Sequence, residues 1–281
     1  YNILESSRKD FDQTNQYETT KWLKKNNPDT IIITSALVGG IQINSKYPLD
    51  FLYQNSMIAL NIINSANEIN CQRLVFLGAS CMYPKNSKQP FKETTILDGK
   101  VEKTNEGYGI AKILGTKLVE FMNIQHDRKY ISIIPAASYG PNDCYDEKIN
   151  HVIPALIQKF HNAKVNKNKY VEVWGTGNAR REFLHVDDMA SGIVFLLENY
   201  YENSPINLGT GEEISIKEIN KLVAKVTDFK GKISFDKSKP DGIPRKILNS
   251  KKIQSLGWKP SISLIDGLKK TYKIYLDNIK K

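Results

Sequence analysis

Short apolar runs alternate with longer amphipathic stretches along the first half of the chain. The runs at 30–40, 72–80 and 130–141 are rich in β-branched residues and end in glycine, proline or small polar residues. Such runs are typical of strands that are buried on both faces of a parallel sheet. Between them, 48–70 and 107–126 repeat apolar residues with the spacing of a helix. This alternation predicts right-handed β-α-β units and a parallel sheet covered by helices.

The pattern changes after about residue 145. Helices are expected at 151–164, 215–229 and 264–279, and strands at the start of 171–200 and of 232–247. A further helix is expected to begin near Val186-Asp187-Asp188, where the two carboxylates suit a helix N-terminus and have a structural role. We therefore predict a doubly wound α/β domain over 1–145 and a smaller α+β domain over 146–281, with some later segments returning to the first sheet.

Composition narrows the class of protein. Of 281 residues, 40% are hydrophobic and 25% are charged, which is ordinary for a globular chain, and no apolar run is long enough to predict a membrane span. The net charge of +10 raises nucleic acid binding as a function. However, 34 of the 40 basic residues are lysines, and they are scattered rather than grouped in blocks. We therefore expect solvated surfaces with a modest attraction for anionic substrates, and no nucleic acid partner.

The three cysteines, Cys71, Cys81 and Cys144, form no CxxC pair. Such a sparse set argues against a disulfide framework and against a zinc site. We expect no metal centre and a reducing, cytoplasmic location.

One pair of residues is a candidate for catalysis. Ligands of doubly wound sheets bind where loops leave the carboxyl ends of the strands. The helix that follows the second such loop begins with "GYGIAKILG", in which Tyr108 and Lys112 are four residues apart and so share one face. A pair at this spacing is most often an exposed helix face, but the preceding strand-end loop favours a functional role.

Six motifs extend this observation over the whole chain. They are "GASCMYPKNSKQPFKE" (78–93), "TNEGYGIAKI" (104–113), "NHVIPALIQKFH" (150–161), "VWGTGNARREFLHVDDMA" (173–190), "INLGTG" (206–211) and "KPDGIPRKIL" (239–248). With its Tyr-x-x-x-Lys signature, the chain resembles the extended short-chain dehydrogenase/reductases, and within them the GDP-L-fucose synthases. The resemblance implies a Rossmann-like fold and an NADP(H)-dependent enzyme. Its activity would be 3,5-epimerisation and 4-reduction of GDP-4-keto-6-deoxy-D-mannose.

The resemblance implies the roles of four residues. Tyr108 would give a proton to the alkoxide that forms at C4, and Lys112 would lower the pKa of the phenol and bind the nicotinamide ribose. Cys81 and His151 would act as base and acid on opposite faces of the sugar, where the ketone acidifies the protons at C3 and C5. The simpler alternatives are a surface lysine, a small buried thiol and a helix-capping histidine.

The resemblance also implies the ligand contacts. Arg181 and Lys246 suit a diphosphate by charge, and Arg181 also by its bidentate geometry. The remaining implied contacts with the GDP-sugar are Trp174, Asn150 and, more weakly, Asp241. Arg8, Tyr108, Lys112 and His151 are the implied contacts with the cofactor, with Arg8 placed to meet the 2′-phosphate of NADP.

Two features depart from the family pattern. The first is that no glycine-rich GxxGxxG loop occurs, and "YNILESSRKDFD" reads as the second strand of the fold. We expect that a strand-turn-helix piece of roughly 30 residues precedes the printed sequence. The alternative is that the cofactor site has been lost.

The second departure is Ala79, which stands where the family has a catalytic serine. An alanine cannot donate the serine's hydrogen bond to the substrate carbonyl, and loss of such a donor costs about a hundredfold to a thousandfold in related sites. Ser80 is adjacent, but on a strand its side chain would point to the other face. The sequence therefore leaves three readings open: the synthase, a reductase or epimerase of a related GDP-sugar such as a heptose, and a non-catalytic nucleotide-sugar binding protein. A homodimer formed by helices 52–68 and 107–126 is expected from the resemblance.

Overall fold

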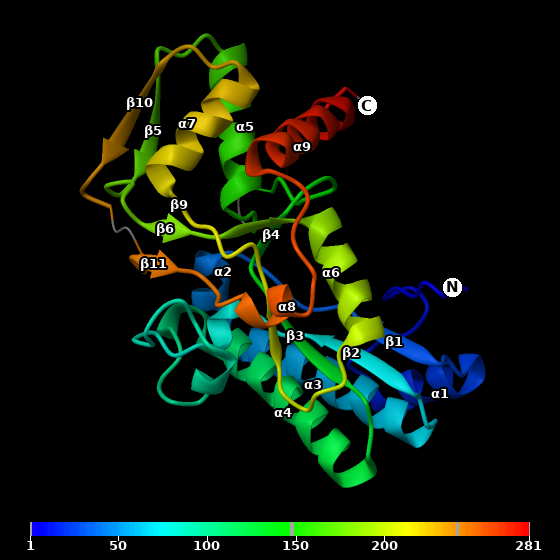
Figure 1. Cartoon of the computed structure of the whole chain (residues 1–281). Helices are drawn as coiled ribbons and strands as arrows, with labels where there is room; N and C mark the ends of the chain where they lie inside the picture. Colours follow the sequence, from blue (N-terminus) through cyan, green and yellow to red (C-terminus); the bar gives the residue numbers. More distant parts are fainter. Residues whose placement is uncertain (1, 147–148, 240–241, 281) are drawn as a thin grey trace. The chain divides into compact units, whose positions relative to one another are not determined.

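The computed structural model describes residues 2–146, 149–239 and 242–280 (Figure 1). Contacts divide the chain into two units. The first comprises residues 1–84, 96–134 and 195–206, and the second comprises 85–95, 135–194 and 207–281. The chain therefore passes between the units several times, and each unit is described separately below.

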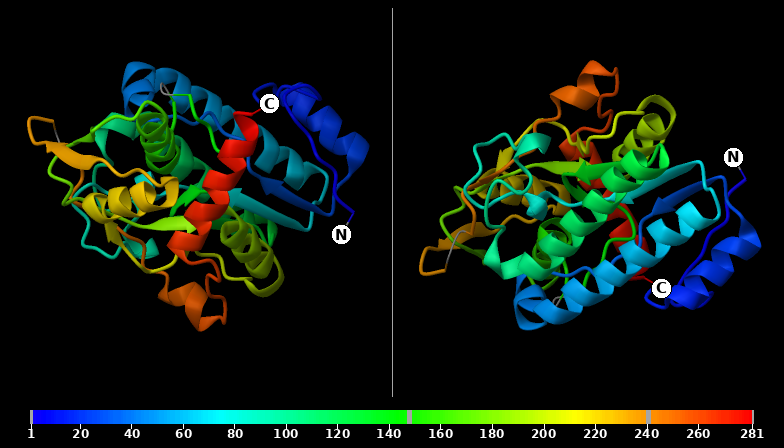
Figure 2. Two further views of the ribbon diagram at one scale, coloured as in Figure 1. Left: turned by 90° about the horizontal axis from the view of Figure 1, so that it is seen from above. Right: turned by 90° about the horizontal axis from the view of Figure 1, so that it is seen from below.

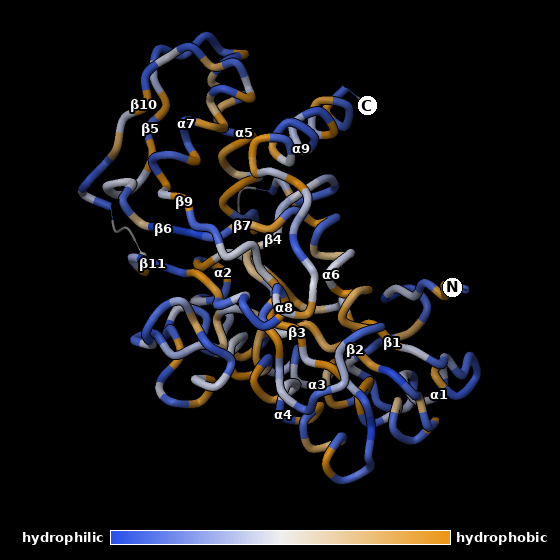
Figure 3. Tube along the Cα trace, in the orientation of Figure 1, coloured by the Kyte–Doolittle hydropathy of each residue, from blue (hydrophilic) through white to orange (hydrophobic). Residues whose placement is uncertain are grey.

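A parallel sheet forms the centre of the first unit. Its strands are β1 (Thr30–Ile33), β2 (Arg73–Leu77), β3 (Ile131–Pro135) and β8 (Ile206–Leu208, whose last two residues belong to the second unit), in the order β1-β2-β3-β8. β1 is parallel to β2, and β2 is parallel to β3. Figure 3 shows β3 as mostly hydrophobic, as a strand buried on both faces should be. The predicted parallel α/β fold is confirmed.

Four helices accompany this sheet. They are α1 (Gln16–Asn26), α2 (Ile41–Lys46), α3 (Pro48–Glu68) and α4 (Glu106–His126), with 3-10 turns η1 (Ser80–Met82) and η3 (Lys103–Asn105). α3 and α4 run side by side (Figure 2). Buried side chains of α1, α3, β2 and α4 form one apolar cluster, which includes Leu23, Ile63, Leu74 and Val119.

The start of the chain differs from the prediction. Residues 2–6 were expected to form a strand, but they are exposed and have no regular structure. A strand needs a neighbour for its backbone hydrogen bonds. Among the described strands, β1 is the edge of its sheet and pairs with β2 alone, so residues 2–6 are not paired with it.

Three small sheets and a layer of helices form the second unit. Two sheets pair β4 (Ala137–Tyr139) with β7 (Phe183–His185) and β5 (Tyr170–Trp174) with β10 (Lys232–Asp236). In the third, β6 (Arg180–Arg181) lies between β11 (Arg245–Lys246) and β9 (Ile214–Ser215). The helices are α5 (Val152–Val165), α6 (Val186–Asn199, whose last residues belong to the first unit), α7 (Ile216–Thr227), α8 (Lys251–Ser255) and α9 (Leu264–Asn278), with the 3-10 turn η2 (Glu93–Thr95). Ile157, Phe160, Val223 and Leu268 lie in their shared core.

The predicted structural role of the "HVDD" segment agrees with the contacts. α6 begins at Val186 with Asp187 and Asp188 in its first turn. The buried carboxylate of Asp188 accepts hydrogen bonds from the backbone N–H groups of Ser261 (3.0 Å) and Ile262 (2.9 Å) and from the Ser261 hydroxyl. It therefore fastens the loop before α9 to the start of α6. Among the described helices, none has both the length and the apolar character needed to cross a bilayer.

Candidate functional site

The turn that follows β2 carries the first group of candidate residues. The Gly78 N–H still pairs with the Ile133 carbonyl oxygen (2.8 Å), and the chain then turns into η1, which holds Cys81. A Cβ on Gly78 would lie 2.9 Å from Met82 Sδ, so glycine allows this turn to close. Ala79 precedes η1 in an extended conformation. Ser80 belongs to η1 and not to a strand, so the expectation that strand alternation turns its side chain away was wrong.

Glycines on either side of Tyr108 bring α4 close to its neighbours. A Cβ on Gly107 would lie 2.3 Å from the Pro48 carbonyl oxygen at the start of α3. A Cβ on Gly109 would lie 3.0 Å from the carbonyl oxygen of Cys81. The first turn of α4 is thus pressed against both α3 and η1, and this fixes the position of Tyr108 between the two glycines.

Lys112 is buried behind Tyr108. Its Nζ donates a hydrogen bond to the Leu77 carbonyl oxygen (2.9 Å) at the end of β2. The same nitrogen lies 4.9 Å from the ring centre of Phe76 and 5.5 Å from that of Tyr108. Burial lowers the pKa of Lys112 to about 8, and the negative charge of an ionised Cys81 opposes this shift.

The pKa of Tyr108 shifts in the direction opposite to the one expected. Burial raises it, and an ionised Cys81 raises it further. The expectation of a lowered pKa was therefore wrong for the protein alone, because burial penalises the phenolate. Since Cys81 acts on both Tyr108 and Lys112, these three side chains form one electrostatically connected group.

Arg8 lies apart from this group within the first unit. It is exposed in a turn where the Asp10 carboxylate accepts hydrogen bonds from the Ser7 N–H (2.7 Å) and hydroxyl (2.9 Å). Its charge helps to lower the pKa of Asp12, after the larger effect of two hydrogen bonds from Thr14. Within the described chain, no hydrogen bond or ion pair connects Arg8 with Tyr108 or Lys112.

His151 lies at the start of α5 in the second unit. It is the N-cap residue, with an extended backbone and an exposed side chain, and Asn150 before it is half-buried. The alternative of a capping side chain is not supported, since the His151 side chain makes no capping hydrogen bond in this described segment. Burial raises the pKa of Asp143, and the charge of a protonated His151 opposes that rise. Asp143 is thus a neighbour of His151 that sequence reasoning missed, because the chain between them shows no motif.

The remaining candidates lie on β5 and on the sheet β11-β6-β9. Trp174 ends β5 and is 57% exposed, with Lys239 Nζ 5.7 Å from its ring centre. Arg181 and Lys246 are register partners in the parallel pair β6–β11, so their side chains share one face. The structure thereby brings together two residues that are 65 positions apart in the sequence. Asp241 lies outside the described residues.

Comparison with known proteins agrees with this geometry. Residues 3–209 match the NAD dependent epimerase/dehydratase family. The chain belongs to this family. It is 45% identical to GDP-L-fucose synthase 1 of Arabidopsis thaliana over 99% of this chain and 86% of that protein.

Two solved structures of reductases are also similar to this chain. A GDP-6-OMe-4-keto-L-xylo-heptose reductase from C. jejuni matches with a TM-score of 0.93 and 33% identity, over 99% of this chain and 91% of that one. A GDP-mannoheptose C4 reductase from Campylobacter jejuni, solved with NADP bound, matches with a TM-score of 0.88 and 36% identity, over 96% and 88% of the two chains.

The Tyr108–Lys112 group of this epimerase/dehydratase family member fits the nicotinamide end of an NADP cofactor. An ammonium has three N–H donors, and the described residues supply Lys112 with one hydrogen-bond acceptor, the Leu77 carbonyl oxygen. Ribose hydroxyls at the carboxyl edge of the sheet would satisfy the others. The described residues include no glycine-rich loop for the pyrophosphate, so the fit concerns the nicotinamide end alone.

Proposed function

We propose that this protein converts GDP-4-keto-6-deoxy-D-mannose to GDP-L-fucose by epimerisation at C3 and C5 and NADPH-dependent reduction at C4. The observation that carries the proposal is the group formed by half-buried Tyr108 with buried Lys112 and Cys81 at the carboxyl end of β2, in a chain that is 45% identical to a GDP-L-fucose synthase. Three groups that exchange protons, placed where this fold binds its ligands, suit proton transfer beside a ketone.

Tyr108 is the proton donor for the reduction. NADPH, when bound, supplies a hydride to C4 of the sugar. The oxygen at C4 then takes a proton from the Tyr108 hydroxyl, which is protonated at neutral pH because its pKa is raised. The Lys112 ammonium, whose pKa is about 8, stabilises the phenolate that remains.

Cys81 and His151 exchange protons with C3 and C5 before the reduction. Both carbons adjoin the ketone, so loss of a proton gives an enolate, and return of a proton to the opposite face inverts the centre. One residue acts as base and the other as acid. The Lys112 ammonium attracts the negative charge of an ionised Cys81, and the Asp143 carboxylate attracts the positive charge of a protonated His151.

The second unit binds the nucleotide sugar. Arg181 and Lys246 on one face of β6–β11 bind the diphosphate, and Trp174 offers an exposed ring for stacking. Asn150 contacts the sugar, and Asp241 stays a weaker candidate. Arg8 and His151, together with Tyr108 and Lys112, contact NADP(H). We also propose that the chain consists of a cofactor-binding domain up to about residue 145 and a substrate-binding domain after it.

A related GDP-sugar is the second candidate for the substrate. Two observations favour it: Ala79 in place of the family serine, and the similarity to two heptose reductases. Assays with GDP-4-keto-6-deoxy-D-mannose and with the corresponding GDP-4-keto-heptose decide between the two. A higher kcat/KM with the heptose would replace the first proposal, and binding of both sugars without turnover would support a non-catalytic protein.

We infer a homodimer formed through α3 and α4. Both helices expose large apolar side chains, among them Tyr53, Ile110, Phe121 and Ile124, of which Ile124 is 66% exposed. Apolar side chains gathered on two packed helices are typical of a protein interface. We also infer a cytoplasmic location, because three cysteines without a CxxC pair are typical of a reducing compartment.

A further inference from the structure

Two short strands of the second unit each carry two successive basic residues. β6 is Arg180–Arg181 and β11 is Arg245–Lys246, and the two strands are parallel. Arg180 is the register partner of Arg245, and Arg181 is that of Lys246. Because side chains alternate along a strand, the Arg180–Arg245 pair lies on one face and the Arg181–Lys246 pair on the other.

Glu213 binds the first pair. Its two carboxylate oxygens accept hydrogen bonds from Nε of Arg180 (2.9 Å) and from Nε of Arg245 (2.6 Å). Arg180 also donates to the backbone oxygen of Glu213 (3.1 Å). The Glu213 side chain is only 19% exposed. Burial, the largest single effect, raises the pKa of Glu213. The hydrogen bonds and positive charges of Arg245 and Arg180 together lower the pKa by more, so the carboxylate stays ionised.

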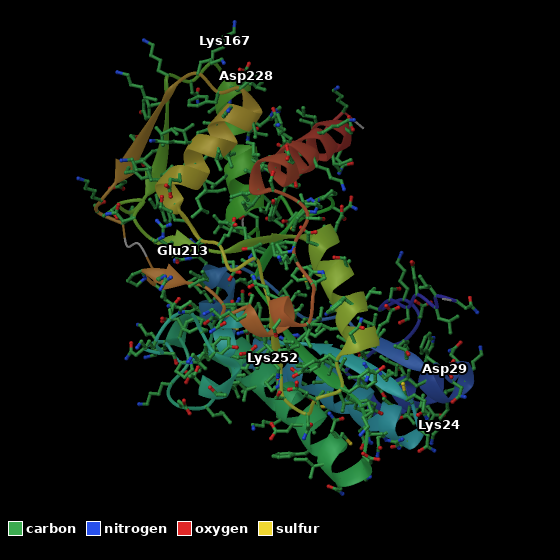
Figure 4. The ribbon with its side chains drawn as sticks, viewed as in Figure 1. Lys24, Asp29, Lys167, Glu213, Asp228 and Lys252 are labelled. Atoms are coloured by element: carbon green, nitrogen blue, oxygen red, sulfur yellow. The ribbon has the colours of Figure 1, made fainter. Side chains whose placement is uncertain are left out.

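The position of Glu213 makes it a link between three strands. It directly precedes β9, which is antiparallel to β6, and Figure 4 shows it beside β6 and β11. Like charges in register on neighbouring strands repel one another. The carboxylate lies between the two guanidinium groups and offsets that repulsion, so it holds β11 against β6. The same register aligns Arg181 with Lys246 on the other face.

We propose that Glu213 is a positioning residue that sets the spacing of Arg181 and Lys246 for the diphosphate of the nucleotide sugar. The inference rests on the proposed function, because that function assigns a diphosphate to this pair. A second support keeps β11 in place without Glu213, since Gln89 accepts from the Ile247 N–H (3.0 Å) and donates to the Arg245 carbonyl oxygen. Glu213→Gln is therefore expected to fold.

The test is calorimetric binding of GDP to the full-length protein and to Glu213→Gln, with Glu212→Gln as the matched control. Glu212 is the exposed neighbour of Glu213, and both changes remove one negative charge. If only the net charge of the protein mattered, both variants would bind the anionic GDP more tightly than the wild type. The positioning role predicts that Glu213→Gln binds GDP about tenfold more weakly, while Glu212→Gln does not lose affinity.

Steady-state kinetics adds a readout that general destabilisation would not produce. The KM for the GDP-sugar should rise about tenfold in Glu213→Gln, while kcat and the KM for NADPH change less than about twofold. Arg180→Lys keeps the charge but loses the Nε hydrogen bond, and should weaken GDP binding in the same direction. If Glu213→Gln and Arg180→Lys bind GDP as tightly as the wild type or more tightly, the positioning role is overturned but the proposed function is not. A wild-type protein that binds no GDP would instead contradict the proposed function.

Discussion

Lys112 donates its hydrogen bond to the carbonyl oxygen of Leu77, 2.9 Å away, at the point where β2 ends. This bond fastens the face of α4 that carries Tyr108 and Lys112 to the carboxyl end of the parallel sheet, where such folds bind their ligands. Burial of the amine lowers its pKa to about 8, so at neutral pH the folded protein bears a positive charge in its interior.

The phenol of Tyr108 is expected to be essential for reduction. Tyr108→Phe removes the proton donor without changing the shape of the ring, and should lower the rate of NADPH oxidation by about a hundredfold to ten-thousandfold. GDP binding should stay unchanged. Tyr130→Phe is the matched control, since its buried hydroxyl contacts only the Cys71 carbonyl oxygen (3.3 Å) among the described groups. Equal losses in both variants would argue against a chemical role for Tyr108.

Stability should depend on pH through Lys112. Below about pH 8 the amine is protonated in both states, and the folded state bears the full cost of burying its charge. As the pH rises from about 8 to 10.5, the folded amine loses its proton while the unfolded one keeps it, so the stability increases. The shift corresponds to about 3 kcal/mol.

Urea unfolding of the wild type and of Lys112→Met, near neutral pH and near pH 10.5, measures this effect. The wild type should gain stability relative to Lys112→Met across that window. Lys103→Met, at an exposed position in η3, should show no such difference. A constant difference between the wild type and Lys112→Met would contradict the lowered pKa.

Ala79 should limit the rate of reduction. Its extended backbone accepts a serine without strain. A hydroxyl that reaches the substrate carbonyl would raise kcat, by up to about a hundredfold. Single-turnover rates of Ala79→Ser and of Ala79→Cys, a substitution of similar size with a weaker donor, test this. If Ala79→Ser is no faster than Ala79→Cys, the substrate carbonyl already has all the hydrogen-bond donors that the reduction needs.

Gly107 should tolerate no side chain. A Cβ there would overlap the Pro48 backbone, so Gly107→Ala should displace the first turn of α4 and cost about 1–3 kcal/mol in the free energy of unfolding. Activity should fall with it, because Tyr108 is the next residue. Glu106→Ala, at an exposed position in the same turn, is the control and should change the stability by less than about 1 kcal/mol. Thermal unfolding and crystallography of both variants test this prediction. Gly107→Ala would contradict it by being as stable as Glu106→Ala, with the first turn of α4 in place.

The exposed apolar faces of α3 and α4 should hold two copies together. Phe121→Glu places a charge within that surface and should shift the protein from dimer to monomer in light scattering. Tyr17→Glu changes an aromatic residue of α1 that is still more exposed, and should leave the dimer intact. A monomeric wild type, or a dimer that survives Phe121→Glu, rules out this interface.

Periodicity predicted elements with strong local patterns, such as the strand Arg73–Leu77 and the helix Val152–Val165, but it missed α1 (Gln16–Asn26). Non-local features could not be predicted in this way. The close approach of Gly107 to Pro48 depends on how two helices pack, and the link of Glu213 to Arg180 and Arg245 depends on strands that are distant in the sequence. The direction of the Tyr108 pKa shift depends on burial, which spacing alone does not reveal. The role of each candidate residue stays a prediction.

The most direct test is NADPH oxidation by the full-length protein with GDP-4-keto-6-deoxy-D-mannose, with identification of the product. The proposed function predicts that one NADPH is consumed per sugar and that the product is GDP-L-fucose, inverted at C3 and C5. A sugar that binds without any oxidation of NADPH would contradict the account, and so would a reduced product that keeps the starting configuration at C3 and C5.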